Sequence, residues 1–210
     1  SGCRGTALFV TGINDERSTF TLNSGTISGN TSPGSSSTGA VFVQNAADFI
    51  MNGGTISGNT ATQGVGGAVA VYDGGLMAGE GESIQIYNTG FTMNGGTITG
   101  NRARVGGGIY SFSNGSVLNA GTITNNTASD KGGGVYSEGN TQGYSTLKMY
   151  NAYITDNSAT QGGGLWFCAT GQGKIYISDG AAIAENTASG AGDDLVFTST
   201  TTRQNKLTLA

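Results

Sequence analysis

Short groups of apolar residues return along this chain in a common register, separated by glycine and asparagine. The phrase G-T-I-S/T-G/N-N recurs at 25–30, 54–59, 96–101 and 121–126, and weaker versions stand at 152–157 and 181–186. Within each unit, Asn-Gly, Gly-Gly and Gly-Asn turn signals separate three short strand-like pieces. A repeat of about 30 residues that is rich in glycine and β-branched residues predicts a solenoid of β-strands.

Three strands per turn of chain are the cross-section of a parallel β-helix, and inward side chains then form columns along its axis. One column is Ile27, Ile56, Ile98, Ile123, Ile154 and Ile183. A second is Leu8, Val41, Val69, Ile109, Val135, Leu165 and Leu195. A third is Leu22, Met51, Met93, Leu118 and Met149, flanked by Phe20, Phe49, Phe91 and Leu147. We therefore predict an all-β, right-handed parallel β-helix of the pectin-lyase-like superfold, with about seven coils that rise about 4.8 Å each.

The same repeat spans residues 1–210, so we expect one domain. Residues 5–10 already have the pattern of the middle of a repeat, which indicates a fragment of a longer surface protein.

Asparagine also recurs in register and predicts amide ladders at two corners of the coil, because an amide both donates and accepts. One ladder is Asn30, Asn59, Asn101, Asn126, Asn157 and Asn186. The other is Asn23, Asn52, Asn94, Asn119 and Asn151, with Asp179 in the last coil. Asparagine also tolerates the left-handed conformation that such corners require. The Gly runs, such as 106–108 and 132–134, lack the Gly-Lys-Ser/Thr ending of a phosphate loop and fit tight turns instead.

Composition excludes several classes of function and does not identify one. Only 10% of the residues are charged, the net charge is −4, and no histidine is present. The nine Lys and Arg residues are scattered, so no basic stripe is available for nucleic acid. No apolar run is long enough to insert this segment into a membrane. Cys3 and Cys168 fall on the first and sixth repeats, too far apart for a disulfide.

Two sequence signatures alternate around the coil and resemble a known family. Gly-Gly-x-Val/Ile/Leu stands at 66–69, 106–109, 132–135 and 162–165, and Phe-x-x-Asn stands at 20–23, 49–52 and 91–94. This pairing resembles the repeats of the polymorphic outer-membrane protein family and similar repeats in adhesin-like surface proteins of gut bacteria and archaea. The resemblance implies an extracellular β-helix at a bacterial or archaeal cell surface that mediates attachment.

Alternation along the Gly-Gly strand places one residue per coil on the outside. This outward row is Phe9, Phe42, Ala70, Tyr110, Tyr136, Trp166 and Val196. An exposed aromatic strip would offer flat apolar area with polar edges to a glycan or a host extracellular protein. Phe42, Tyr110, Tyr136 and Trp166 are our candidate ligand-binding residues. Stacking that only stabilises the sheet, or a neighbouring domain that covers the strip, would explain the row equally well.

Two further surfaces are candidates. A ladder of threonine and serine flanks the Ile column (Thr26 and Ser28, Thr55 and Ser57, Thr97 and Thr99, Thr122 and Thr124) and resembles the ice-contacting face of β-helical antifreeze proteins, but it fails at Tyr153 and Ala182. The longest excursion from the repeat runs from Asp73 to Thr89 and contains Glu80 and Glu82. Shorter ones run from Thr31 to Ser37 and from Glu138 to Ser145. Insertions of this kind carry binding specificity in many repeat proteins.

Polysaccharide lyases and hydrolases share the β-helix and remain the alternative, since they need clustered carboxylates or a Ca²⁺ site. The acidic candidates are Asp73, Glu80, Glu82, Glu138, Asp193 and Asp194. By register Asp73 and Glu138 lie two coils apart, and Arg102 and Arg104 have no acids in register. We therefore expect no catalytic residues, no metal and no cofactor. The prediction is a non-catalytic, adhesin-like β-helix that binds a glycan or host protein; ice binding and a structural spacer are further alternatives.

Overall fold

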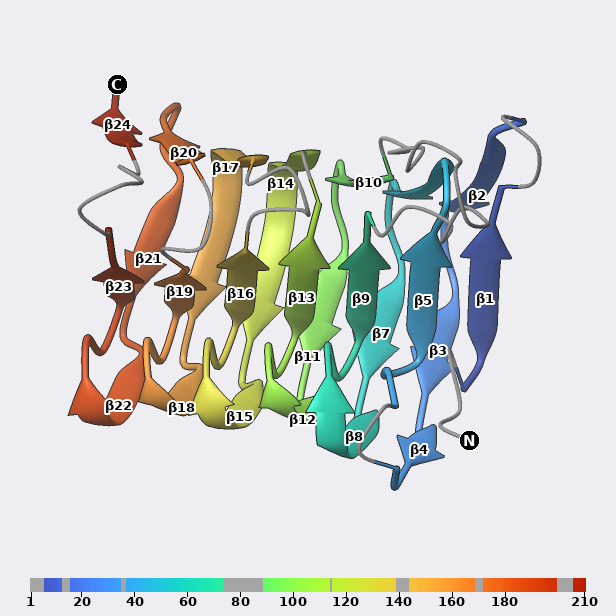
Figure 1. The fold of residues 1–210 in the computed structure, drawn as a ribbon, viewed down its shortest axis with the longest axis horizontal. Coiled ribbons are helices and arrows are strands. Elements are labelled where there is room, and N and C mark those ends of the chain that lie inside the picture. Colours follow the sequence, from blue (N-terminus) through green and yellow to red (C-terminus); the bar gives the residue numbers. More distant parts are fainter. Residues whose placement is uncertain are drawn as a thin grey trace, which may run out of the picture.

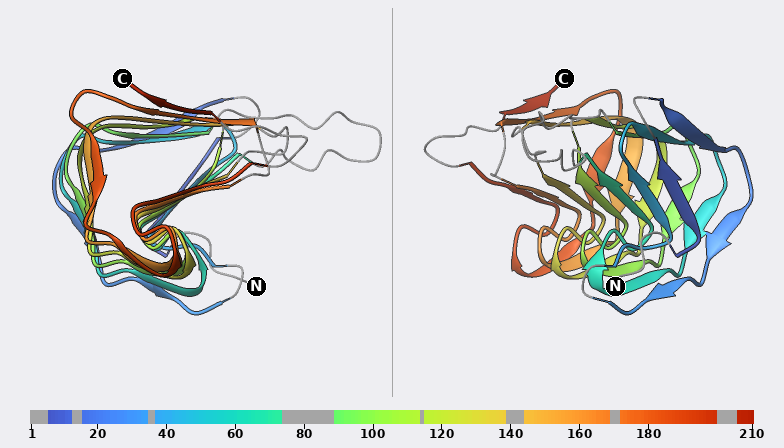
Figure 2. Two further views of the ribbon diagram at one scale, coloured as in Figure 1. Left: turned by 90° about the vertical axis from the view of Figure 1, so that its left-hand side faces the viewer. Right: turned by 45° about the vertical axis from the view of Figure 1, so that its right-hand side comes forward.

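The computed structural model of the chain describes residues 6–12, 16–34, 37–73, 89–113, 115–138, 144–168, 172–199 and 206–210. These residues form 24 strands and no helix, and every strand pairing among them is parallel. The strands make three sheets that wind around one core, which confirms the predicted right-handed parallel β-helix (Figure 1). Viewed along the rod, the walls of successive coils superimpose (Figure 2).

The seven-stranded sheet contains the strands that follow the Gly-Gly turns and the equivalent strands of the first two coils and the last one. They are β1 (Leu8–Thr11), β5 (Val41–Gln44), β9 (Val69–Tyr72), β13 (Ile109–Phe112), β16 (Val135–Glu138), β19 (Leu165–Phe167) and β23 (Leu195–Phe197). They stand side by side in chain order (Figure 1). Where glycine begins such a turn, there is a physical reason: Gly132 has φ +65°, and an added Cβ would lie 2.5 Å from the Val135 carbonyl oxygen.

The eleven-stranded sheet makes two walls of each coil. Its strands are β2 (Ser18–Leu22), β3 (Thr26–Ser28), β6 (Ala47–Met51), β7 (Thr55–Ser57), β10 (Gly90–Met93), β11 (Thr97–Thr99), β14 (Gly115–Thr124), β17 (Tyr144–Thr155), β20 (Gln172–Ile177), β21 (Ala182–Ala184) and β24 (Lys206–Leu209). The long strands β14 and β17 run through the corner between the walls and join them into one sheet.

The six-stranded sheet closes each coil. Its strands are β4 (Thr31–Ser32), β8 (Thr60–Val65), β12 (Arg102–Val105), β15 (Thr127–Lys131), β18 (Ser158–Gln161) and β22 (Thr187–Ala191). The register of neighbouring strands shifts within this sheet, for example between Ala103 and Val105. Strands of different length are therefore paired on this wall.

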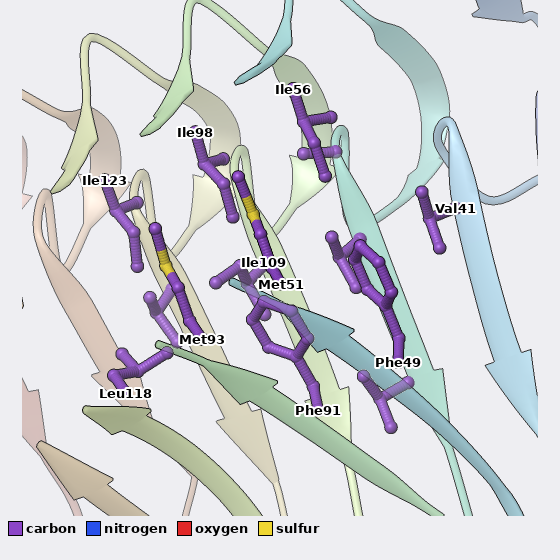
Figure 3. Packing of buried hydrophobic residues seen from close by; sticks show 14 of the residues in the cluster. Val41, Phe49, Met51, Ile56, Phe91, Met93, Ile98, Ile109, Leu118 and Ile123 are labelled. Atoms are coloured by element: carbon purple, nitrogen blue, oxygen red, sulfur yellow. The ribbon is translucent and has the colours of Figure 1, made fainter. Parts of the chain in front are cut away.

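The predicted columns form the core. Phe49 and Phe91 are fully buried with ring centroids 5.3 Å apart. Met51 and Met93 lie beside them, and Ile56, Ile98 and Ile123 form the next column (Figure 3). Because like side chains stack one coil apart, each coil buries its apolar residues against the neighbouring coils as well as within itself.

The buried asparagine ladder is confirmed. In each step the Oδ1 of one asparagine accepts from both the backbone N–H and the side-chain amide of the asparagine one coil earlier; for Asn101 and Asn126 the distances are 3.0 and 2.9 Å. The amide of Asn126 also donates to the carbonyl oxygens of Ile98 and Thr124. One side chain thus satisfies several backbone groups at a buried corner.

The exposed ladder holds over four coils and then fails. The amides of Asn52, Asn94 and Asn119 each donate to the preceding Oδ1 at 2.7–2.8 Å. Asn151, which we expected to extend this ladder, lies opposite Ala120 instead. The prediction was wrong because the unbroken register of β14 and β17 fixes the pairing regardless of where asparagine occurs.

The left-handed residue at the buried corner precedes each ladder asparagine and is not the asparagine itself. Glycine holds this position in the first coils, as at Gly58 with φ +62°. In the last three coils the position is Asn125, Asp156 and Glu185, with φ between +55° and +60°. The corner geometry is therefore kept at the cost of backbone strain.

Candidate binding surface

The predicted outward row lies in one register across the seven-stranded sheet. Phe9, Phe42, Ala70, Tyr110, Tyr136, Trp166 and Val196 are successive Cα partners. The residues on either side of them, such as Val41 and Val43, belong to the core. The direction of these side chains is therefore as the alternation predicts.

Their exposure is not as predicted. Phe9 is 45% exposed, but Phe42 is 5% exposed, Tyr136 is 8% exposed and Ala70 is buried. The rings stack face to face: the centroids of Tyr110 and Tyr136 are 5.3 Å apart at an interplanar angle of 4°. Because this spacing matches the strand separation, the ring faces cover one another and only edges point outward. Phe42 and Tyr136 are thus not free contact residues, while Tyr110 and Trp166 are half-buried.

A second outward row lies two residues further along the same strands and was missed from the sequence. Gln44, Tyr72, Phe112 and Glu138 are Cα partners in it. The rings of Tyr72 and Phe112 stack with centroids 4.9 Å apart, and Tyr72 is 40% exposed. The same alternation rule would have found this row, had it been continued by one step.

Glu138 joins the two rows. One of its oxygens, Oε2, accepts hydrogen bonds from the hydroxyl groups of Tyr110 at 3.4 Å and Tyr136 at 3.2 Å. Burial raises the pKa of Tyr110, and the charge of Glu138 raises it further. The pKa of Tyr136 is also raised, most by burial and then by the hydrogen bond with Cys168 and the charge of Glu138. Both phenols therefore stay protonated as donors, and their hydrogen bonds to the carboxylate fix the orientation of the two rings.

Trp166 lies at the edge of the aromatic stack, next to a cation. The Nζ atom of Lys131, at the end of β15, is 5.0 Å from the centroid of the Trp166 ring, within cation–π range. The indole N–H is buried and has no hydrogen-bond acceptor among the described residues. We name the outer side chains Tyr72, Tyr110, Phe112 and Trp166, together with Glu138, the aromatic face.

The acidic candidates are separated. Asp73 is fully buried, whereas Glu138 belongs to the outward row two strands away. Asp193 Oδ1 accepts from the Ala188 N–H at 2.7 Å, and Asp194 accepts from Asn186. Glu80 and Glu82, with most of the 73–89 excursion, lie outside the described residues, as does Cys3. Within the described ranges, no three Asp, Glu, Cys or His side chains are grouped as metal ligands.

The threonine ladder beside the Ile column is in register as predicted. Thr26, Thr55, Thr97 and Thr122 are successive partners, and Tyr153 and Ala182 follow them. As for membrane insertion, the described residues include no helix that could span a membrane.

Comparison with known proteins identifies one of the repeats. The sequence model of the Chlamydia polymorphic membrane protein repeat matches residues 121–138. This segment contains Ile123, the ladder residue Asn126, the Gly132–Gly134 turn and strand β16 with Tyr136 and Glu138. The resemblance inferred from the sequence is therefore confirmed at this repeat. Neither the curated proteins nor the solved structures yielded a match.

Proposed function

Since residues 121–138 are a repeat of the polymorphic membrane protein type, we propose that this β-helix is displayed at a bacterial cell surface as a non-catalytic, adhesin-like binding module. The family match supports a bacterial protein and gives no support to an archaeal one. The sequence left a glycan and a host extracellular protein as equal partners, and the geometry of the aromatic face favours the protein.

The observation that carries the proposal is the face-to-face stacking of the outward rings. A sugar binds best on the open face of an aromatic ring, but Tyr110 and Tyr136 use these faces against each other. The edge of Tyr110, together with Tyr72 and Phe112, forms an apolar ridge with polar hydroxyl groups. Aromatic residues with this amphipathic character are enriched in protein–protein contacts.

Rigidity supports the same conclusion. The hydroxyl groups of Tyr110 and Tyr136 are held by Glu138, and the Trp166 ring is held beside Lys131. Side chains that are fixed before binding lose little conformational entropy when a partner docks. An aromatic face on a β-sheet wall is therefore pre-organised for a contact.

The test is a binding screen of the protein against immobilised extracellular-matrix proteins and glycans. Replacement of Tyr72, Phe112 and Trp166 by alanine should weaken binding of a matrix protein at least about tenfold, because truncation of central aromatic contacts costs about 2 kcal/mol or more. Tyr153→Ala is the matched control, since this tyrosine lies on another wall and its exposure, 46%, is similar to the 40% of Tyr72. Its binding should equal that of the wild type.

Other outcomes select the alternatives. New reducing ends or unsaturated sugars in the glycan samples would identify a polysaccharide-degrading enzyme. Binding of a matrix protein that survives the triple substitution would move the contact away from the aromatic face. No binding and no cleavage would identify a structural spacer.

A further inference from the structure

A separate feature lies on the outer face of the six-stranded sheet, where hydroxyl side chains form a row interrupted by one cation. The register partners along this row are Thr31, Thr60, Arg102, Thr127, Ser158 and Thr187. The hydroxyl group of Ser158 donates to that of Thr127, one coil earlier, at 3.2 Å. Arg102 is exposed in the middle of the row.

The sheet is hollowed beside Arg102. Between Ala103 and Val105 strand β12 has only Arg104, whereas β8 has residues 62–64 and β15 has residues 129–130 between the corresponding pairs. Because the middle strand is shorter than both neighbours, the outward side chains do not close over it. The result is an open depression of about 180 Å³ lined by Thr60, Thr62, Arg102, Ala103, Thr127 and Ser129.

The two arginines of β12 differ in their bonding. Arg104 is engaged on both sides, with Nη1 3.6 Å from Asp130 Oδ2 and Nε donating to the Gln63 carbonyl oxygen at 3.4 Å. The guanidinium group of Arg102 makes no hydrogen bond or ion pair within the described ranges, and it lines the depression. Arg102 is thus the cation on this face that is available to a ligand.

We propose that this depression binds the acidic group of a glycan, a carboxylate or a sulfate ester, with Arg102 as its ligand. A guanidinium group presents a planar fork that matches both anions. The hydroxyl groups of Thr60, Thr62, Thr127 and Ser129 both donate and accept, as sugar hydroxyl groups do, and Ala103 provides a small apolar floor.

The size and charge of the site set its ligand class. The volume is below the roughly 300–1,000 Å³ of sites for drug-sized molecules, so one sugar residue enters at a time. Nucleic acid would need several cations along its backbone, and this wall offers one uncommitted arginine in a protein of net charge −4. The hydroxyl row continues across neighbouring coils and provides contacts for adjacent sugars.

The proposal is tested with short glycans and two matched variants. The probes are trigalacturonate for carboxylates, a κ-carrageenan-derived tetrasaccharide, which carries sulfate esters and no carboxylate, for sulfates, and fully methyl-esterified trigalacturonate as the uncharged control. Binding is measured by titration calorimetry. We expect the wild type to bind one or both charged probes and not the ester; the preferred probe tells the carboxylate source from the sulfate source.

Arg102→Gln should weaken this binding about tenfold or more, since it removes a charge-assisted contact. Arg104→Gln removes the same charge from the same strand, and should change binding less than about twofold. Equal losses in both variants would show diffuse charge attraction and overturn the site, as would binding unaffected by Arg102→Gln or no binding of either charged probe. The Tyr72, Phe112 and Trp166 substitutions should leave this binding intact, so failure of the aromatic face and failure of this site are distinguishable.

Discussion

Asp194 Oδ1 accepts hydrogen bonds from the backbone N–H of Asn186 at 3.1 Å and from its side-chain amide at 3.0 Å. These are the two bonds that each earlier ladder asparagine makes to the asparagine of the next coil. The carboxylate comes from the same coil, eight residues further along the chain. Asp194 therefore accepts from Asn186 in the way that the next-coil asparagine does for the other ladder residues.

Asp194→Ala should lower the free energy of unfolding by about 1–3 kcal/mol, because two donors of the buried Asn186 lose their acceptor. Asp194→Asn keeps an Oδ1 acceptor and should stay within about 0.5 kcal/mol of the wild type. Urea unfolding followed by circular dichroism measures both. Equal stability of the wild type and the alanine variant would refute the capping role.

The buried and exposed ladders should differ sharply in how much each asparagine contributes to the free energy of unfolding. Asn101 accepts from Asn59 and donates to the Ile56 and Thr99 carbonyl oxygens, all at a corner without solvent. Asn101→Ala should cost about 2–4 kcal/mol, because several buried groups lose partners. Asn94→Ala, in the exposed ladder, should cost less than about 1 kcal/mol because water replaces the amide. Similar losses for the two variants in urea would contradict this assignment.

The buried phenols make the fold sensitive to alkali. The pKa values of Tyr110 and Tyr136 are raised in the folded state, chiefly by burial, above the unfolded value of about 10. As the pH rises past about 10, the unfolded chain loses these two protons before the folded protein does. The contribution of the two tyrosines to the free energy of unfolding is therefore full below about pH 10 and falls above it. Urea unfolding measured above about pH 10 should show that the free energy of unfolding declines as the pH rises. In the same samples, part of the phenolate absorbance should appear only when the protein unfolds.

The variant with both Tyr110→Phe and Tyr136→Phe should lose part of this alkaline slope. Tyr153→Phe, on another wall, serves as the control. A slope that is unchanged in the double variant would show that other groups cause the alkaline transition.

Three positions with nearly equal positive φ should respond differently to substitution. Glu185→Gly removes a side chain from φ +60° and should stabilise the protein by about 0.5–1 kcal/mol. Gly58→Ala should destabilise by about 1 kcal/mol through strain alone, since an added Cβ meets no atom within 4 Å. Gly132→Ala should cost more than about 2 kcal/mol, because the Cβ would also clash with the Val135 carbonyl. Thermal unfolding of the three variants tests the order, and a loss at Gly58 as large as at Gly132 would reject it.

The sequence was sufficient for the features that depend on register alone. The Ile column and the ladder from Asn30 to Asn186 follow from one repeating phrase, because parallel strands place equivalent residues opposite each other. The position of Asn151 was mistaken, since similar residues were aligned where the strand pairing instead sets the partner. Alternation correctly gave the direction of Tyr136 but not its exposure, which depends on how closely the neighbouring rings stack. The depression beside Arg102 was not predicted, because it arises from a difference in length between neighbouring strands.

The buried ladder has a consequence for how such a protein can change over generations. Its asparagines are separated by 29, 42, 25, 31 and 29 residues, yet every step makes the same pair of bonds. A gene segment running from one ladder codon to the next encodes a complete coil whose two ends have the same interface. Duplication or deletion of that segment by recombination brings together coils that already fit, so the rod can lengthen, shorten or exchange its outer loops without redesign of its interior.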